Sequence, residues 1–173
     1  MRFLAAIFLW FSLALSGATQ ELSPPVLIIN SDRVYAESAY GQRIEADLAA
    51  LVADLQAEND TIAQTLRAEE LSLTERRPDM DPAAFRAEAD AFDSKVQDVR
   101  EARDAKNAEL QVMSAEARAQ FKEGMQEVVA EVMLERGAQI VMEQRSVLLS
   151  VSAANITDMV IARMNAELGD GAR

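Results

Sequence analysis

The chain has 173 residues, with 29 acidic and 17 basic side chains and no histidine or cysteine, so its formal net charge is −12. This balance excludes nucleic acid as the main partner, because phosphate binding needs clustered Lys and Arg. The missing histidine and cysteine also exclude Ser-His and Cys-His nucleophiles, disulfides and the usual transition-metal sites. We therefore expect neither an enzyme nor a protein with a bound cofactor.

The first residues have the pattern of an export signal. Arg2 precedes an apolar run from Phe3 to about Leu15, and the small residues Ser16 and Ala18 follow. This pattern predicts a signal peptide over residues 1–18, cleaved after Ala18. The alternative is an uncleaved membrane anchor, but the run is shorter than the ~20 residues that a spanning helix needs.

Residues 19–38 are predicted to form the first part of a β-rich body. After Pro24 and Pro25 comes VLIIN, an apolar run of strand length over residues 26–30. A short helix is expected to follow, capped by Ser31 or Asp32.

Residues 39–136 are predicted to form an antiparallel helical hairpin with its turn near residues 76–82. The turn is RRPDMDP, in which Asp81 is placed to cap the second helix and Pro82 to begin it. Gly137 is placed to end that helix. Each helix carries one narrow apolar stripe, and the segment holds 22 acidic and 12 basic side chains. Such a hairpin is too long to fold over a globular core and is expected to project as an arm.

Residues 137–173 are predicted to complete the body with two strands and a helix. The strands are Ile140–Met142 and Val147–Leu149, and the final helix is expected to be capped by Asn155 with Asp158 three residues on. The hairpin returns the chain to its start, so the first strand can pair with these. A sheet of about three short strands leaves open edges, which a homo-oligomer would close. The residues predicted for this oligomerisation body are Val26, Ile28, Ile140, Met142 and Leu148.

Flexible apolar side chains are the best candidates for a binding surface on the arms, because they adapt to many partners. The candidates are Met80 and Phe85 at the turn and Met133 beside the stripe; packing between the arms is the other interpretation of each. For Phe92, Met113 and Phe121, on the stripe itself, packing is favoured. Arg103 and Lys106 interrupt the stripe and are expected to reach acids such as Glu58 or Asp60, or else to mark a stretch where the arm bends.

The order of these elements resembles the Skp/OmpH family of periplasmic chaperones. The residues that carry the resemblance are VLIINSDRVYAES near the start and ERGAQIVMEQRSVLLSVSAANITDMVIARMN near the end. The resemblance implies a mainly α fold, with a long coiled-coil-like hairpin arm on a small β-rich oligomerisation body, assembled as a jellyfish-like homotrimer. It also implies a periplasmic holdase that keeps unfolded outer-membrane β-barrel proteins from aggregating without ATP, with at most peripheral membrane contact.

One feature departs from that family. Familiar members have basic arms, whereas the arm here has a net charge of −10 from its 22 acidic and 12 basic side chains. A lipopolysaccharide site built from basic residues is therefore not expected. The alternative function is a structural or adaptor coiled-coil protein of the cell envelope with one folded partner.

Overall fold

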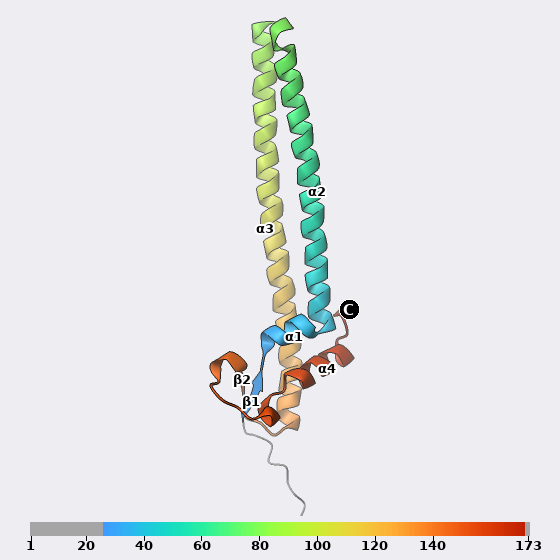
Figure 1. The fold of residues 1–173 in the computed structure, drawn as a ribbon, viewed down its shortest axis with the longest axis vertical. Coiled ribbons are helices and arrows are strands. Elements are labelled where there is room, and N and C mark those ends of the chain that lie inside the picture. The colour runs from blue at the N-terminus through green and yellow to red at the C-terminus, as the bar shows by residue number, and fades with distance from the viewer. Residues whose placement is uncertain (1–25, 172–173) are drawn as a thin grey trace, which may run out of the picture.

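A computed structural model describes residues 26–171 of the chain, so the predicted signal peptide lies outside the described residues. Two long helices form an arm, and the remaining elements gather at its base (Figure 1). We call that base, including the lower end of α3, the body. In chain order the elements are β1 (Val26–Ile29), α1 (Ser31–Glu37), α2 (Ala39–Arg76), η1 (Arg77–Asp79), α3 (Pro82–Glu135), β2 (Ile140–Glu143), η2 (Gln144–Ser146), η3 (Ser152–Ala154) and α4 (Thr157–Glu167).

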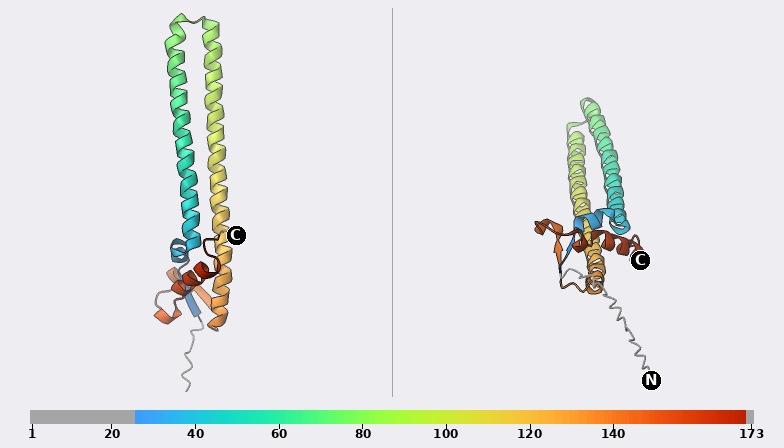
Figure 2. Two further views of the ribbon diagram at one scale, coloured as in Figure 1. Left: turned by 90° about the vertical axis from the view of Figure 1, so that its right-hand side faces the viewer. Right: turned by 60° about the horizontal axis from the view of Figure 1, so that its bottom comes forward.

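The predicted hairpin is confirmed. Helices α2 and α3 run side by side to a turn at the far end of the molecule (Figure 2). The Asp81 side chain accepts hydrogen bonds from the backbone N–H groups of Ala83 and Ala84, and Pro82 is the first residue of α3. The first N–H groups of a helix have no partner inside it, so a proline at this position loses no hydrogen bond. The turn sequence therefore ends α2 and begins α3.

The two arm helices differ in length, and the longer one extends into the body. Helix α3 has 54 residues and α2 has 38. The extra turns of α3 carry a buried face of Phe121, Met125, Val128 and Val132, spaced three or four residues apart as one helix face requires. Gly137 then adopts a φ of 62°, a left-handed conformation that ends the helix and reverses the chain.

The sheet has two strands where about three were expected. Strand β1 pairs with β2 in parallel, with Val26 opposite Ile140 and Ile28 opposite Met142. The predicted strand Val147–Leu149 is wrong for the single chain: its residues lie outside any helix or strand of the described structure. Strand β1 has β2 on one side and a single bridge from Ile28 to Asn155 as its other strand contact, and no third strand pairs with the outer edge of β2 in the described chain.

The hydrophobic core lies in the body and continues into the root of the arm. Leu27, Val34, Val132, Val160 and Met164 have no exposed surface. At the root, the Phe121 ring meets Tyr35 and Tyr40 edge-on, with ring centroids 4.9 and 5.5 Å apart. The core thus joins the first and last elements of the described chain around one end of α3, and the upper arm contributes no buried residue to it.

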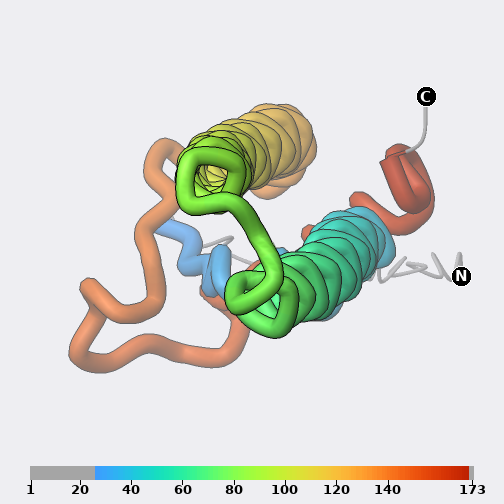
Figure 3. Tube along the Cα trace, turned by 90° about the horizontal axis from the view of Figure 1, so that it is seen from above, coloured from blue at the N-terminus to red at the C-terminus, as the bar shows by residue number. Residues whose placement is uncertain are grey.

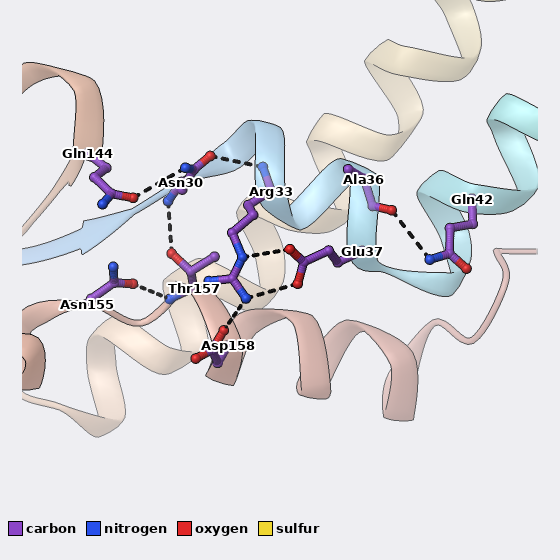
Figure 4. A network of polar contacts seen from close by, with 9 residues as sticks. All are labelled: Asn30, Arg33, Ala36, Glu37, Gln42, Gln144, Asn155, Thr157 and Asp158. Atoms are coloured by element: carbon purple, nitrogen blue, oxygen red, sulfur yellow. Dashed lines mark hydrogen bonds and ion pairs between the residues drawn. The ribbon is translucent and has the colours of Figure 1, made fainter.

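A polar network ties the start of α1 to the start of α4 (Figure 4). The predicted cap was wrong, because Asn30 rather than Ser31 or Asp32 caps α1, its side chain accepting from the Arg33 N–H at 2.9 Å. The Asn30 N–H donates to Thr157 Oγ1 at 3.0 Å, and the Thr157 N–H donates to Asn155 Oδ1 at 2.9 Å. Asn155 thus accepts from the first turn of α4, although the N-cap position is Ile156, one residue later than predicted.

Asp158 does not complete the capping box that its position suggested. Its carboxylate accepts from Arg33 Nη2 at 2.6 Å instead. The same guanidinium pairs with Glu37 and holds the pKa of that carboxyl below its ordinary value, chiefly through the hydrogen bond. The ion pair with a residue 125 positions away has replaced a local cap, which sequence spacing alone does not reveal.

The hydroxyl of Tyr35 gives the arm root a measurable pH dependence. Burial and then a 2.7 Å hydrogen bond to Glu45 raise the pKa of Tyr35 to about 12. The folded chain therefore holds this proton more tightly than the unfolded chain, whose tyrosines titrate near pH ~10. The contribution of Tyr35 to the free energy of unfolding is fully present below pH ~10 and is lost as the pH rises toward about 12.

We expect the free energy of unfolding of Tyr35→Phe to fall less steeply than that of the wild-type protein above pH ~10. Urea unfolding followed by circular dichroism at a series of pH values measures this. Parallel curves for the two proteins across that range would show that Tyr35 titrates as an ordinary tyrosine.

Candidate functional site

The arm helices are held in register by four ion pairs. Lys106 pairs with Glu58 at 2.5 Å, so the predicted contact is confirmed for this residue. The other pairs along the arm are Arg76–Glu88 at 2.7 Å, Lys95–Glu69 at 2.5 Å and Arg118–Glu45 at 3.0 Å. All four pairs are solvent-exposed, so each adds little to the free energy of unfolding. Their main effect is to align α2 with α3.

Arg103 does not reach an acid as expected. Its Nη2 donates to the backbone carbonyl of Asn59 at 3.1 Å, and its buried Nε has no hydrogen-bond partner. The seam between the two arm helices therefore contains one buried donor without a hydrogen-bond partner, at Arg103. Bending of the arm at this point stays a prediction.

The two candidates at the turn lie at the far end of the molecule. Met80 and Phe85 are both half-buried, and the guanidinium of Arg77 lies 5.0 Å from the centroid of the Phe85 ring. Part of each side chain thus remains available to a partner. Their role in binding stays a proposal.

Met133 lies in the body, away from the turn. It is half-buried and packs against the hydrophobic core, while its backbone carbonyl accepts from the Ala138 N–H at 3.0 Å. Its neighbour Leu134 is 76% exposed and presents more apolar surface. Met133 is consequently the weakest of the three predicted binding residues.

The middle of the arm carries exposed apolar surface, including Met113, for which the sequence favoured packing. Leu51, Val52, Val112 and Met113 are between 39% and 56% exposed. Together with the half-buried Leu48, Leu55 and Leu110 they form what we call the mid-arm surface. The apolar stripe on each helix marks the face that turns toward the other helix. The second helix covers only part of that face.

Two shallow grooves follow the seam at the mid-arm surface. One, of about 320 Å³, is lined by Leu51, Leu55, Lys106, Glu109, Leu110 and Met113. The other, of about 460 Å³, is lined by Leu48, Val52, Leu110, Gln111, Ser114, Ala115 and Arg118. Leu110 borders both, so apolar surface is open on either side of the seam.

A larger groove of about 630 Å³ lies nearer the turn. Its lining includes Glu69, Arg76, Glu88 and Lys95 beside Phe92. These four charges form two ion pairs with one another, Arg76–Glu88 and Lys95–Glu69. The groove thus offers less uncompensated charge to a partner than the mid-arm surface does.

The body presents a second apolar surface. Ile140 and Met142 point outward from β2, with exposed fractions of 52% and 39%, while Val26 is half-buried and Ile28 lies inside the chain. Leu148 is 95% exposed on the segment after η2, which loops away from both arm helices (Figure 3). We call the outward set the body patch; it consists of Ile140, Met142, Leu148, Leu149 and Val151.

Neither a membrane span nor a metal cluster accompanies these surfaces. Among residues 26–171, no helix combines the length and apolar character needed to cross a bilayer. The same part of the chain contains no group of three or more acidic side chains arranged to hold a metal ion.

Comparison with known proteins agrees with the arm-and-body architecture. A family model described as outer membrane protein (OmpH-like) matches residues 25–164. The structure is similar to that of a protein from Caulobacter crescentus CB15 proposed to be an outer membrane chaperone (OmpH-like), with a TM-score of 0.81 and 20% sequence identity over 84% of this chain and 86% of that chain. The comparison with curated proteins found no match.

Proposed function

The chain belongs to the OmpH-like family of outer membrane proteins, and from this premise we propose that it is a periplasmic holdase chaperone. It binds unfolded outer-membrane β-barrel proteins between helical arms and keeps them from aggregating, without ATP, a cofactor or catalysis. Export depends on the predicted signal peptide over residues 1–18. The observation that carries the proposal is the open apolar mid-arm surface on an arm that is otherwise strongly charged.

The shape of the arm suits this task. With 38 and 54 residues, α2 and α3 span about 57 and 81 Å at 1.5 Å per residue, far beyond the body. Exposed leucine, valine and methionine side chains contact many different sequences weakly, which is what a general holdase needs. The acidic outer faces keep a loaded complex soluble through net charge. We include Met80 and Phe85 at the turn, and with less weight Met133, among the binding residues.

Assembly through the body patch completes the proposal. A two-stranded sheet is at best marginally stable by itself, and an exposed apolar run beside it favours association. We propose that neighbouring copies cover the body patch and that three chains assemble, so that their arms enclose a common space. Val26 and Ile28 lie opposite Ile140 and Met142 in the sheet and would hold β2 in place behind this interface.

Light scattering tests the holdase directly. A urea-unfolded outer-membrane barrel protein is diluted into buffer with the mature chain at increasing ratios, without ATP. We expect suppression of scattering that saturates near three chains per client. No suppression at any ratio, from a chain shown to be folded, would overturn the proposal; a single folded partner bound tightly at fixed stoichiometry would then favour the adaptor alternative.

The charge of the arm predicts how salt acts on capture. For an acidic client, added salt is expected to leave capture unchanged or strengthen it, because it screens repulsion between like charges. The same scattering assay, repeated from low salt to about 0.3 M, measures this. Capture of an acidic client that collapses with modest salt would contradict the prediction.

A further inference from the structure

The charges around the mid-arm surface are unevenly paired. Residues 45–58 and 104–118 together hold seven acidic and two basic side chains, a net charge of −5. Both basic residues are already engaged, since Lys106 pairs with Glu58 and Arg118 with Glu45. The surface is therefore acidic, and both of its cations already contact acids of the same surface.

Three acids beside the apolar side chains have no ion pair within the described chain: Asp54, Glu109 and Glu116. All three are exposed. Asp54 lies three residues after Leu51 on α2, and Glu109 and Glu116 lie four before and three after Met113 on α3. Residues at these spacings share a helix face, so each acid flanks exposed apolar surface. Glu109 also lines the groove with Leu51 and Met113.

Apolar grooves bordered by unpaired acids select their partner by charge. From this juxtaposition we propose that the mid-arm surface binds segments of unfolded protein that combine apolar side chains with Lys or Arg. The apolar side chains of such a segment enter the two grooves, while its cations approach Asp54, Glu109 and Glu116. This specificity rests on the proposed holdase function and adds to it the chemical class of segment that the arm prefers.

Charge complementarity separates this partner from acidic ones. Opposite charges at the edge of a binding surface raise the association rate and discriminate against partners of like charge. An acidic unfolded segment reaches the same grooves only against repulsion from the arm. Clients are thus held where cationic and apolar residues alternate, and their acidic stretches are left outside.

Two labelled 20-residue peptides test the proposal by fluorescence anisotropy with the full mature chain. Both have the same apolar residues, alternating with Lys in one peptide and with Glu in the other. At low salt we expect the Lys peptide to bind about tenfold tighter or more, since several exposed ion pairs act together. The ratio should shrink toward one at about 0.5 M salt, where screening is strong.

Neutralising variants locate the effect. The triple variant Asp54→Asn, Glu109→Gln, Glu116→Gln is expected to lower the preference for the Lys peptide by about threefold or more. The matched control Glu70→Gln, Asp90→Asn, Asp93→Asn removes the same net charge nearer the turn and should leave most of the preference. Equal effects of the two triples would show that overall charge acts rather than the mid-arm surface, and would overturn the proposal.

The apolar contribution is tested by Leu51→Ser combined with Met113→Ser. Both side chains are exposed, so the fold is expected to survive, which circular dichroism checks. This variant should weaken both peptides by a similar factor. A chain that suppresses aggregation of a barrel protein but binds the Glu peptide as well as the Lys peptide refutes the charge selectivity alone; a chain that fails to suppress aggregation refutes the holdase itself.

Discussion

Replacing Leu148 with glutamate is expected to convert the proposed trimer into folded monomers and to abolish capture of unfolded client. Leu148 is 95% exposed in the single chain, and Leu149 beside it is 88% exposed. Burying one leucine against a neighbouring copy contributes about 1.5–3 kcal/mol, and a buried carboxylate without a partner costs several more. In the proposed trimer this change occurs at three interfaces, so its expected effect is large.

Size-exclusion chromatography with light scattering measures the mass of Leu148→Glu. The matched control is Leu71→Glu, which adds the same charge at a position that is 59% exposed on the arm. We expect the control to keep the mass of the assembled protein. A Leu148→Glu protein with unchanged mass would exclude this part of the body patch from the interface.

Capture distinguishes assembly from simple exposure of apolar surface. If three arms must enclose a client, folded Leu148→Glu monomers lose most of their ability to suppress aggregation even though every arm residue is intact. Monomers that suppress aggregation as well per chain as the wild type would show that a single arm is sufficient.

The arm could be predicted from the sequence because its signals are local. Asp81 and Pro82 lie next to the helix start that they define, and Gly137 occupies the left-handed position that ends α3. The apolar stripes likewise report the face of each helix that turns toward the other. Neighbours within a few residues determine all of these features.

The body was harder to predict because its determinants are far apart in the sequence. Asp158 has the spacing of a capping residue, yet it pairs with Arg33, 125 positions away. Val147–Leu149 has the composition of a strand, but a strand needs a partner, and within the described chain these residues pair with neither β1 nor β2. Which groups are free to pair depends on the tertiary structure.

The candidate site shows the same division. The sequence identified flexible apolar residues at the turn, but it assigned Met113 to packing, whereas this side chain is 42% exposed. A stripe indicates which residues face the partner helix, and the closeness of the two helices decides how much of each is covered. The distance between the two helices depends on side chains of both α2 and α3, so it cannot be predicted from either stripe alone.

The core of the body gives the second large expected effect, a loss of about 2–5 kcal/mol of unfolding free energy for Ile156→Ala. Ile156 is 1% exposed, and its backbone N–H donates to the Ile28 carbonyl at 2.9 Å, so it joins the start of α4 to β1. The truncation leaves a cavity where β1 meets the start of α4. Such a loss is large beside the roughly 5–15 kcal/mol that holds a typical domain folded.

Urea unfolding of Ile156→Ala, followed by circular dichroism, measures this loss. Both proteins are compared at one fixed concentration, since the proposed assembly would make stability depend on concentration. The control Leu134→Ala changes a side chain that is 76% exposed on the same body and should stay within about 0.5 kcal/mol of the wild type. Because the arm has a thin seam and exposed ion pairs instead of a core, we expect its helical signal to be lost together with the body. A helical signal that persists after the body has unfolded would mean that the arm is stable by itself.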